Sequence, residues 1–387
     1  MNRWTTSSRM ETVRMPPVGV IMRRVREIRE SGGKVFSMAQ AVPWYGPPGQ
    51  AVEAMLRRLD SLELHTYSPD PGLESARMAL AADFSSRRGI RLDHGTELHL
   101  TCGASQAFLG ALLSVADPGD RIVALEPWYF DHVFAVGFGS MELVSVPMIE
   151  TDSWNLPVED LETVLKNGAR ALILVNPGNP TGAVLSREEL EWLVDATEAA
   201  GCWLILDETY ERFNFEGSRW HPWEQSHREH VVTLGSFSKS LGISGWRLGY
   251  LFACERVMRQ AVKVQDSVTI CAPVPAQLIM EESMGIEGWV EERAAGVEAR
   301  MRLCRKALEG SRGLEWREAG GAFFTLAACP GRDSMEAAVE LLDRYGIAGI
   351  PGAAFGPAGE GHVRLSFGCL DDRELDEAMQ VLASVRL

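Results

Sequence analysis

One lysine in this sequence stands where a side-chain amine could do chemistry. Lys239 lies in GSFSKSLGISGWRLGY, residues 235–250, directly after the hydroxyls of Ser236 and Ser238 and shortly before Arg247. A lysine is usually a solvated surface residue, but this one follows an apolar run that predicts a buried strand, in a stretch with little charge. The chain has only five lysines, and none of the other four has comparable surroundings. We therefore expect Lys239 to be the reactive amine if the protein uses one.

A turn of small residues after an earlier predicted strand could bind an anion. Gly103, Ala104 and Ser105 follow a strand that ends at Thr101, and an apolar-faced helix begins near Gln106. Free backbone N–H groups and the helix dipole would then face a phosphate or a carboxylate. Small residues after a strand are also common in ordinary turns, so this motif predicts a phosphate site only in company with others.

Two further strand exits carry polar side chains that could contact a ligand. In CWLILDETYERF an apolar strand leads to Asp207, and Tyr210 follows three residues later; in LILVNPGNPTG, Asn179 stands between prolines. Ligands in open α/β sheets bind at the carboxyl ends of the strands, which is where these side chains are expected. The alternatives are an aspartate that caps the next turn and a proline-rich loop that ends a sheet edge.

Together these groups match the needs of one cofactor, pyridoxal phosphate. It requires a lysine for an imine, a carboxylate for its ring nitrogen, hydrogen-bond donors for its phenolic oxygen, and a helix end with an arginine for its phosphate. Each feature alone is a weak signal. A single cofactor explains all of them, in one order along one predicted sheet.

These residues can meet only if the chain folds as an α/β protein. Strands alternate with helices, the pattern of a mostly parallel sheet covered on both faces. A capping box at Ser186 and Glu189 begins one of the helices, and Gly201 closes it. The strands of the large sheet are expected at residues 97–101, 121–125, 171–175, 203–206, 231–234 and 248–253.

The length of 387 residues allows two domains, each with its own apolar core. After residue 280 the chain becomes helical and charged, and short strands then alternate with helices. We expect a large cofactor-binding domain over residues 46–280 and a small C-terminal α/β domain over residues 281–387. Residues 1–45 are expected to form an N-terminal segment that joins the small domain.

The composition and net charge limit the classes of partner that the protein is expected to bind. The formal net charge of −15 argues against nucleic acid or an anionic membrane, because binding these requires concentrated lysine and arginine. No stretch approaches the roughly 18 apolar residues of a membrane helix, and the N-terminus lacks the apolar core of a signal peptide. The seven cysteines form no CxxC pair and predict neither a disulfide framework nor a zinc site. We expect a cytoplasmic protein without a bound metal.

The sequence resembles the class I and II aminotransferases, enzymes of fold type I that use pyridoxal phosphate. The resemblance runs from about Gly19 to Leu382, and NPGNPTG and SFSKSLGISGWRLGY are its most specific motifs. It implies a large domain with a mostly parallel seven-stranded sheet flanked by helices, and a smaller α/β C-terminal domain. It also implies that Lys239 forms the Schiff base with the cofactor and that Asp207 pairs with the ring nitrogen.

The remaining cofactor contacts follow from the same resemblance. Asn179 and Tyr210 would hydrogen-bond the phenolic oxygen, and Tyr129, two residues after the proline of EPWYFDH, would stack on the ring. The phosphate would be held by five residues: Gly103, Ala104, Ser105, Ser236 and Arg247.

Two further matches concern the substrate and a second subunit. Arg364 in HVRLSFG matches an arginine that binds the substrate α-carboxylate as a bidentate fork, and Asn179 would contact the substrate beside it. HTYSPDPGLESAR matches a stretch whose tyrosine reaches the phosphate of the neighbouring subunit. The resemblance therefore implies a homodimer in which Tyr67 completes the partner's site.

The site motifs leave the reaction type open. We expect transamination between an L-amino acid and a 2-keto acid, with Lys239 as the general base at Cα. Elimination or replacement at Cβ or Cγ, or a cyclisation that uses S-adenosylmethionine, is the alternative. A regulator with a DNA-binding module is disfavoured, because the resemblance begins almost at once in an acidic chain.

Two observations bear on the substrate. No arginine clearly matches a binder of a second carboxylate, which weakens a strict preference for aspartate. Ala41, Val42 and Trp44 stand where many members of the family carry a glycine-rich loop. Trp44 and the adjacent Tyr45 are bulky. They could narrow the substrate pocket, or they could pack the junction between the domains.

Overall fold

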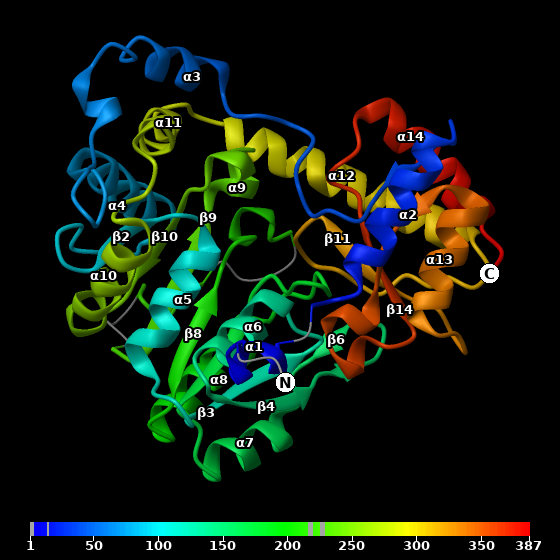
Figure 1. Cartoon of the computed structure of the whole chain (residues 1–387), viewed down its shortest axis with the longest axis horizontal. Helices are drawn as coiled ribbons and strands as arrows, with labels where there is room; N and C mark the ends of the chain where they lie inside the picture. The colour runs from blue at the N-terminus through cyan, green and yellow to red at the C-terminus, as the bar shows by residue number, and fades with distance from the viewer. Residues whose placement is uncertain (1–3, 14, 216–219, 225–228) are drawn as a thin grey trace.

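A seven-stranded sheet forms the centre of the molecule (Figure 1). The computed structural model describes residues 4–13, 15–215, 220–224 and 229–387. The strand order is β2-β10-β9-β8-β7-β3-β4, and only β10 runs antiparallel to its neighbours, so the predicted mostly parallel sheet is confirmed. The strands are β2 (Leu98–Thr101), β3 (Arg121–Glu126), β4 (Glu142–Pro147), β7 (Ala171–Val175), β8 (Trp203–Asp207), β9 (Val231–Ser236) and β10 (Gly249–Phe252).

Helices cover both faces of this sheet because its strands are apolar on both faces. In β7, Leu172 and Leu174 belong to one apolar core, whereas Ala171 and Ile173 belong to another on the opposite face, as the two-residue period of a strand requires. The first core is covered by α3 (Gly49–Leu56), α4 (Glu74–Arg88), α7 (Val158–Lys166), α8 (Arg187–Ala199) and α11 (Val274–Met284). The second is covered by α5 (Ala104–Val115), α6 (Phe130–Phe138) and α10 (Glu255–Thr269).

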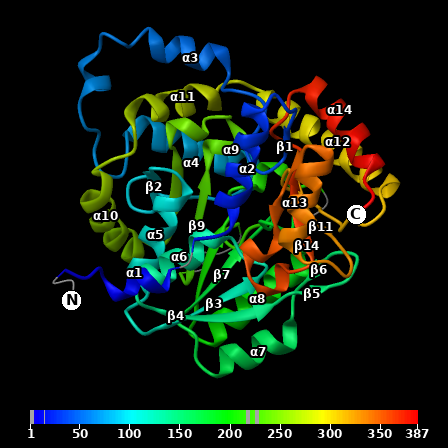
Figure 2. The same cartoon turned by 45° about the vertical axis from the view of Figure 1, so that its right-hand side comes forward.

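A separate apolar core joins the C-terminal part of the chain to its beginning. Ile21 and Val25 of α2 (Val18–Glu30) are buried in it, and β1 (Phe36–Ser37) pairs in parallel with β12 (Ile347–Ala348). Figure 2 shows α2 beside the C-terminal helices. The domain boundaries at residues 45 and 280 remain predictions. The other elements of this part are α12 (Trp289–Gly310), α13 (Ser334–Tyr345), α14 (Asp372–Ser384) and the antiparallel sheet of β11 (Phe324–Ala328), β14 (His362–Ser366) and β13 (Ile350–Pro351).

Sequence patterns predict six strands of the central sheet to within two residues at each end. They miss β4, which lies at the sheet edge and carries partly or fully exposed side chains at most of its positions. The capping box that begins α8 is present, because Ser186 and Glu189 exchange both of its hydrogen bonds, and Gly201 adopts a φ of 66° just after the helix. Short elements outside these layers include α1 (Ser8–Thr12), β5 (Ile149–Glu150) and β6 (Trp154–Asn155).

No helix in the described ranges combines the length and the apolar character that crossing a membrane demands.

Candidate active site

The carboxyl ends of β7, β8 and β9 open into one cavity of about 570 Å³. Its other walls come from α2 and residues 39–42, from the first turns of α5 and α6, from residues 244–247, and from the C-terminal part. Ten of the site residues predicted from the sequence line it, although they come from segments that lie far apart in the chain. They are Ala104, Ser105, Tyr129, Asn179, Asp207, Tyr210, Ser236, Lys239, Arg247 and Arg364.

Lys239 lies in the short helix α9 (Phe237–Ser240), immediately after β9. The hydroxyl of Ser236 caps this turn by accepting a hydrogen bond from the N–H of Ser238 at 3.1 Å. The Lys239 amine donates to the carbonyl oxygen of Ala41 at 2.6 Å. Burial, assisted by the nearby charges of Arg364 and Arg247, lowers the pKa of Lys239 from 10.5 to about 8. Roughly one-tenth of the amine is therefore uncharged at pH 7 and can act as a nucleophile or a base.

Asp207 ends β8 with a carboxylate that is only 4% exposed. One oxygen accepts a hydrogen bond from the Thr209 N–H at 2.9 Å, and the other lies 3.1 Å from Nε2 of His132. The His132 ring stacks on Phe108 with a centroid separation of 3.9 Å. These two contacts fix the orientation of the buried Asp207 carboxylate, which lines the cavity.

His132 is a site residue that the sequence analysis missed. It lies in the first turn of α6, three residues after Tyr129, so a helix beginning there puts both side chains on one face. Their rings meet edge to face at 5.3 Å. This spacing was the available signal, but it becomes informative only once the helix start is known.

An anion cradle forms at the N-terminus of α5. Gly103 caps this helix with a φ of +80°, a conformation that favours glycine. A Cβ at this position would lie 2.4 Å from Nη2 of Arg247, so the guanidinium closes directly over the helix end. Gly103 itself does not line the cavity, whereas Ala104 and Ser105 do. Helix N–H groups and an arginine together favour a phosphate here.

Arg364 reaches the cavity from β14. One guanidinium nitrogen donates to Oδ1 of Asn179 at 2.9 Å, and another donates to the carbonyl oxygen of Ala39 at 2.8 Å. The group lies 5.3 Å from the ring centroid of Phe324 and 4.9 Å from that of Phe355. Its Nε has no hydrogen-bond partner, so the guanidinium keeps N–H groups that could donate to a carboxylate.

The two predicted tyrosines differ in their contacts. Tyr210 is 3% exposed and packs edge to face against Phe323 and Phe324, and burial raises the pKa of its phenol well above the ordinary value. The Tyr129 hydroxyl donates to Asp131 at 2.7 Å, and burial with this carboxylate raises its pKa as well. Both phenols therefore stay protonated. Tyr210 can donate a hydrogen bond to a ligand, whereas the proton of Tyr129 is already donated to Asp131.

Tyr67 is a predicted site residue that does not line the cavity of a single chain. Its side chain is 75% exposed, and it is not among the cavity-lining residues. Its role beside the phosphate of a second subunit remains a prediction.

Trp44 and Tyr45 are likewise absent from the described residues that line the cavity. The Arg300 guanidinium lies 3.5 Å from the ring centroid of Trp44, and the Tyr45 ring meets that of Trp289 edge to face at 5.5 Å. The Tyr45 hydroxyl donates to the backbone oxygen of Lys239 at 2.9 Å. Of the two alternatives, packing against α12 at the junction fits these contacts.

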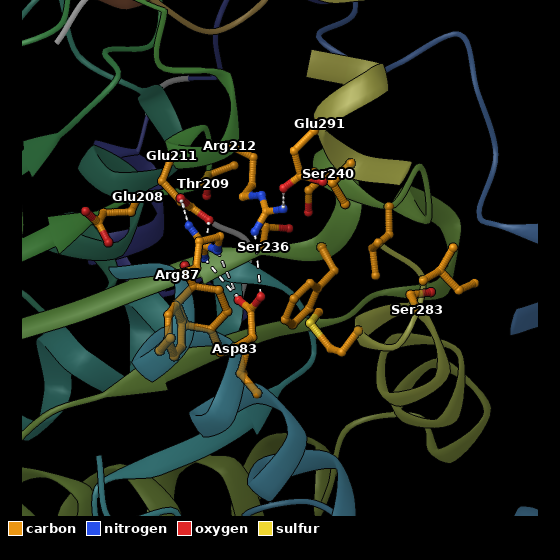
Figure 3. A pocket seen from close by; sticks show the side chains of 18 of the residues that line it. Asp83, Arg87, Glu208, Thr209, Glu211, Arg212, Ser236, Ser240, Ser283 and Glu291 are labelled. Carbon is orange, nitrogen blue, oxygen red and sulfur yellow. Dashed lines mark hydrogen bonds and ion pairs between the residues drawn. The ribbon is translucent and has the colours of Figure 1, made fainter. Parts of the chain in front are cut away.

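A second cavity, of about 440 Å³, is lined by Glu208, Thr209 and Glu211, which follow β8 in the chain (Figure 3). Ser236 and Thr209 line both cavities. Figure 3 shows Arg87 of α4 between two carboxylates; it lies 2.8 Å from Glu211 and 3.1 Å from Asp83.

A buried ion pair and an exposed one extend this network. Arg88 of α4 binds Glu208 through two hydrogen bonds of 2.8 and 3.0 Å, and both side chains are at most 5% exposed. Arg212 contacts Glu291 of α12 at 2.7 Å. The segment that carries Asp207 and Tyr210 is therefore tied to a helix on each side.

The cavity fits pyridoxal phosphate by the chemistry of its donors. It places an amine of lowered pKa, a buried and oriented carboxylate, and a helix N-terminus closed by an arginine around one space. Lys239 would hold the cofactor's aldehyde carbon, Asp207 its ring nitrogen, and the cradle at Gly103 its phosphate.

Comparisons with known proteins agree with this geometry. The family model described as aminotransferase class I and II matches residues 34–382. An aromatic aminotransferase of Arabidopsis thaliana is 31% identical over 92% of this chain and 91% of its own length. The structure of an aromatic aminotransferase from Pyrococcus horikoshii is 30% identical, with a TM-score of 0.85 over 94% of this chain and 97% of that one. That of an aspartate aminotransferase double mutant from Thermus thermophilus is 27% identical, with a TM-score of 0.91 over 98% and 99%. The chain belongs to the class I and II aminotransferases.

Proposed function

We propose that this enzyme transfers an amino group between an L-amino acid and a 2-keto acid, with pyridoxal phosphate held at Lys239. The observation that carries the proposal is the shared cavity of Lys239, Asp207 and Arg364. This reaction requires an amine that can hold the cofactor, a carboxylate for its ring nitrogen and a guanidinium that binds the substrate α-carboxylate.

Each of these side chains has a defined task in the reaction. When bound, pyridoxal phosphate supplies an electron sink for the electrons released when the substrate loses its Cα proton. Arg364 binds the substrate α-carboxylate, and Asn179 at 2.9 Å keeps the guanidinium in place. Lys239, with a pKa near 8, takes the Cα proton as an uncharged amine and later returns a proton. Asp207, oriented by His132, keeps a proton on the ring nitrogen.

The alternative reactions, elimination, replacement and cyclisation, are not favoured by the comparisons. The similar proteins include aromatic and aspartate aminotransferases, and they align over nearly the whole chain. A substrate without a leaving group at Cβ or Cγ, such as leucine, separates the two classes because it can only be transaminated.

The lysine assignment can be tested by substitution. Lys239→Ala should abolish the absorbance band of covalently held cofactor and the amino-transfer activity, while leaving the circular dichroism spectrum unchanged. Lys166→Ala is the matched control, because that side chain is 74% exposed on α7. Retention of the band by Lys239→Ala would refute the assignment.

We also propose a homodimer in which Tyr67 contacts the phosphate in the partner's site. Supporting this, Leu56, Leu59 and Leu62 are 51%, 53% and 75% exposed in the segment that leads to Tyr67. Several large apolar side chains exposed along one segment are characteristic of an interaction surface. Figure 1 shows α3 and the chain beyond it at the end of the molecule away from the C-terminal helices.

Complementation between inactive subunits tests this arrangement. A Tyr67→Ala subunit combined with a Lys239→Ala subunit forms one complete site only if Tyr67 acts across the interface. Mixed dimers should then bind cofactor at that site with the affinity of the native enzyme. If the mixed dimers bind cofactor only as weakly as Tyr67→Ala alone, Tyr67 does not act across the interface.

A cytoplasmic location completes the proposal. All seven cysteines lie in described residues and are free thiols, which supports a reducing compartment.

A further inference from the structure

Part of the active-site cavity has no task in holding the cofactor. Four apolar side chains line this part: Val18 and Met22 from α2, Phe130 at the start of α6, and Ile350 of β13. All four belong to or pack against one apolar cluster, in which Ile350 is 2% exposed. Val18 and Met22 are four residues apart in α2 and therefore share one helix face. The cavity thus has an apolar wall built from three elements.

Among the described residues of one subunit, no cationic side chain is left for this wall. Among the described residues that line it, the cationic side chains are Lys239, Arg247 and Arg364, and each already has a task in the proposed reaction. His132 is engaged with Asp207. The only other charged lining residue in the described ranges is Asp131, a carboxylate that accepts a hydrogen bond from Tyr129.

Neighbouring arginines do not add a cationic side chain to the cavity. Arg23, Arg24 and Arg26 of α2 are exposed, and none of them lines the cavity. Arg24 forms an ion pair with Asp343 at 2.8 Å, away from the cavity. A second substrate carboxylate would therefore leave water for an apolar wall and a like charge, which is strongly unfavourable.

We infer that the substrate side chain is apolar or aromatic, and that the site discriminates against aspartate and glutamate. This inference rests on the proposed function, because it concerns the same cavity. Family membership does not make the choice, since the similar proteins include both aromatic and aspartate aminotransferases. The choice comes from Val18, Met22, Phe130 and Ile350, which offer burial to a hydrocarbon side chain and no counter-charge to a carboxylate.

The test is the half-reaction of the holoenzyme with single amino acids and no keto acid. Phenylalanine, leucine, methionine, aspartate and glutamate are each mixed with the enzyme, and the change in cofactor absorbance is followed over a range of concentrations. We expect kcat/KM for the best apolar donor to exceed that for aspartate and glutamate by about tenfold or more. A faster reaction with aspartate or glutamate overturns the inference and leaves the proposed function intact. No reaction with any amino acid overturns the proposed function and this inference with it.

A charge introduced into the apolar wall gives a second, independent readout. Met22→Arg should lower kcat/KM for phenylalanine and raise it for aspartate, shifting their ratio by at least about tenfold. Val20→Arg is the matched control, because Val20 lies in the same helix, is 43% exposed and does not line the cavity. An equal change of the ratio in both variants would show that Met22 does not face the substrate side chain. The ratio in the native enzyme decides the inference even if Met22→Arg fails to fold.

Discussion

The environment of Lys239 predicts the pH at which its amine loses a proton. Burial and the charges of Arg364 and Arg247 lower its pKa from 10.5 to about 8. At pH 7 roughly one-tenth of the amine is then uncharged, against roughly one part in three thousand for an ordinary lysine. The fraction that can react with an aldehyde is therefore about 300-fold larger. Removing one cation by Arg364→Met should raise the pKa, although burial should still hold it below 10.5.

Competitive labelling of the protein after cofactor removal measures this directly. Trace acetylation is carried out between pH 6 and 11, and mass spectrometry follows the extent of labelling of each lysine. The labelling of Lys239 should reach half its maximum near pH 8, well below the value of 10.5 that is usual for a lysine. The midpoint reports the pKa even if burial slows the absolute rate. A midpoint for Lys239 near 10.5 would refute burial as a cause of the lowered pKa. A midpoint that Arg364→Met leaves unchanged would refute the contribution of the Arg364 charge.

The same pKa shift has a consequence for stability. Between pH 8 and 10.5 the unfolded chain holds a proton on Lys239 that the native protein has released. The contribution of this lysine to the free energy of unfolding therefore rises with pH across that window and is constant below it.

Three further substitutions test parts of the site. Gly103→Ala would place a Cβ against the guanidinium that closes the anion cradle. In an absorbance titration the dissociation constant of the cofactor should therefore rise about tenfold or more. The free energy of unfolding should fall by only about 1 kcal/mol. Glu208→Leu removes the nearest counter-charge of buried Arg88, so the free energy of unfolding measured in urea should fall by about 3 kcal/mol. Glu191→Gln, at an exposed ion pair, is the control and should lower it by less than about 1 kcal/mol. Equal effects of the two substitutions would contradict the burial argument. His132→Phe should keep the stacked ring but lose the contact to the carboxylate at the end of β8, so kcat should fall about tenfold with the melting temperature little changed.

The sequence could predict the cofactor groups because most of them lie next to strand ends. A buried parallel strand is a continuous apolar run, and the polar residue that follows it marks the edge of the sheet where ligands bind. Asp207 and Lys239 could be located in this way with no knowledge of the rest of the fold. His132 escaped this reasoning because it lies inside a helix, where an isolated histidine in the sequence carries no sign of its contact with Asp207.

The substrate side-chain wall could not be predicted from any local pattern, for a different physical reason. Val18 and Ile350 stand at opposite ends of the chain and meet only because α2 packs against the C-terminal part. In the sequence, Val18 and Met22 are simply the apolar residues of an amphipathic helix, and burial in a core would give the same pattern. Whether such a residue faces a core or a substrate depends on a cavity that the sheet, α2 and β13 form together. The residues that decide which amino acid enters are therefore those for which a three-dimensional structure adds the most to the sequence.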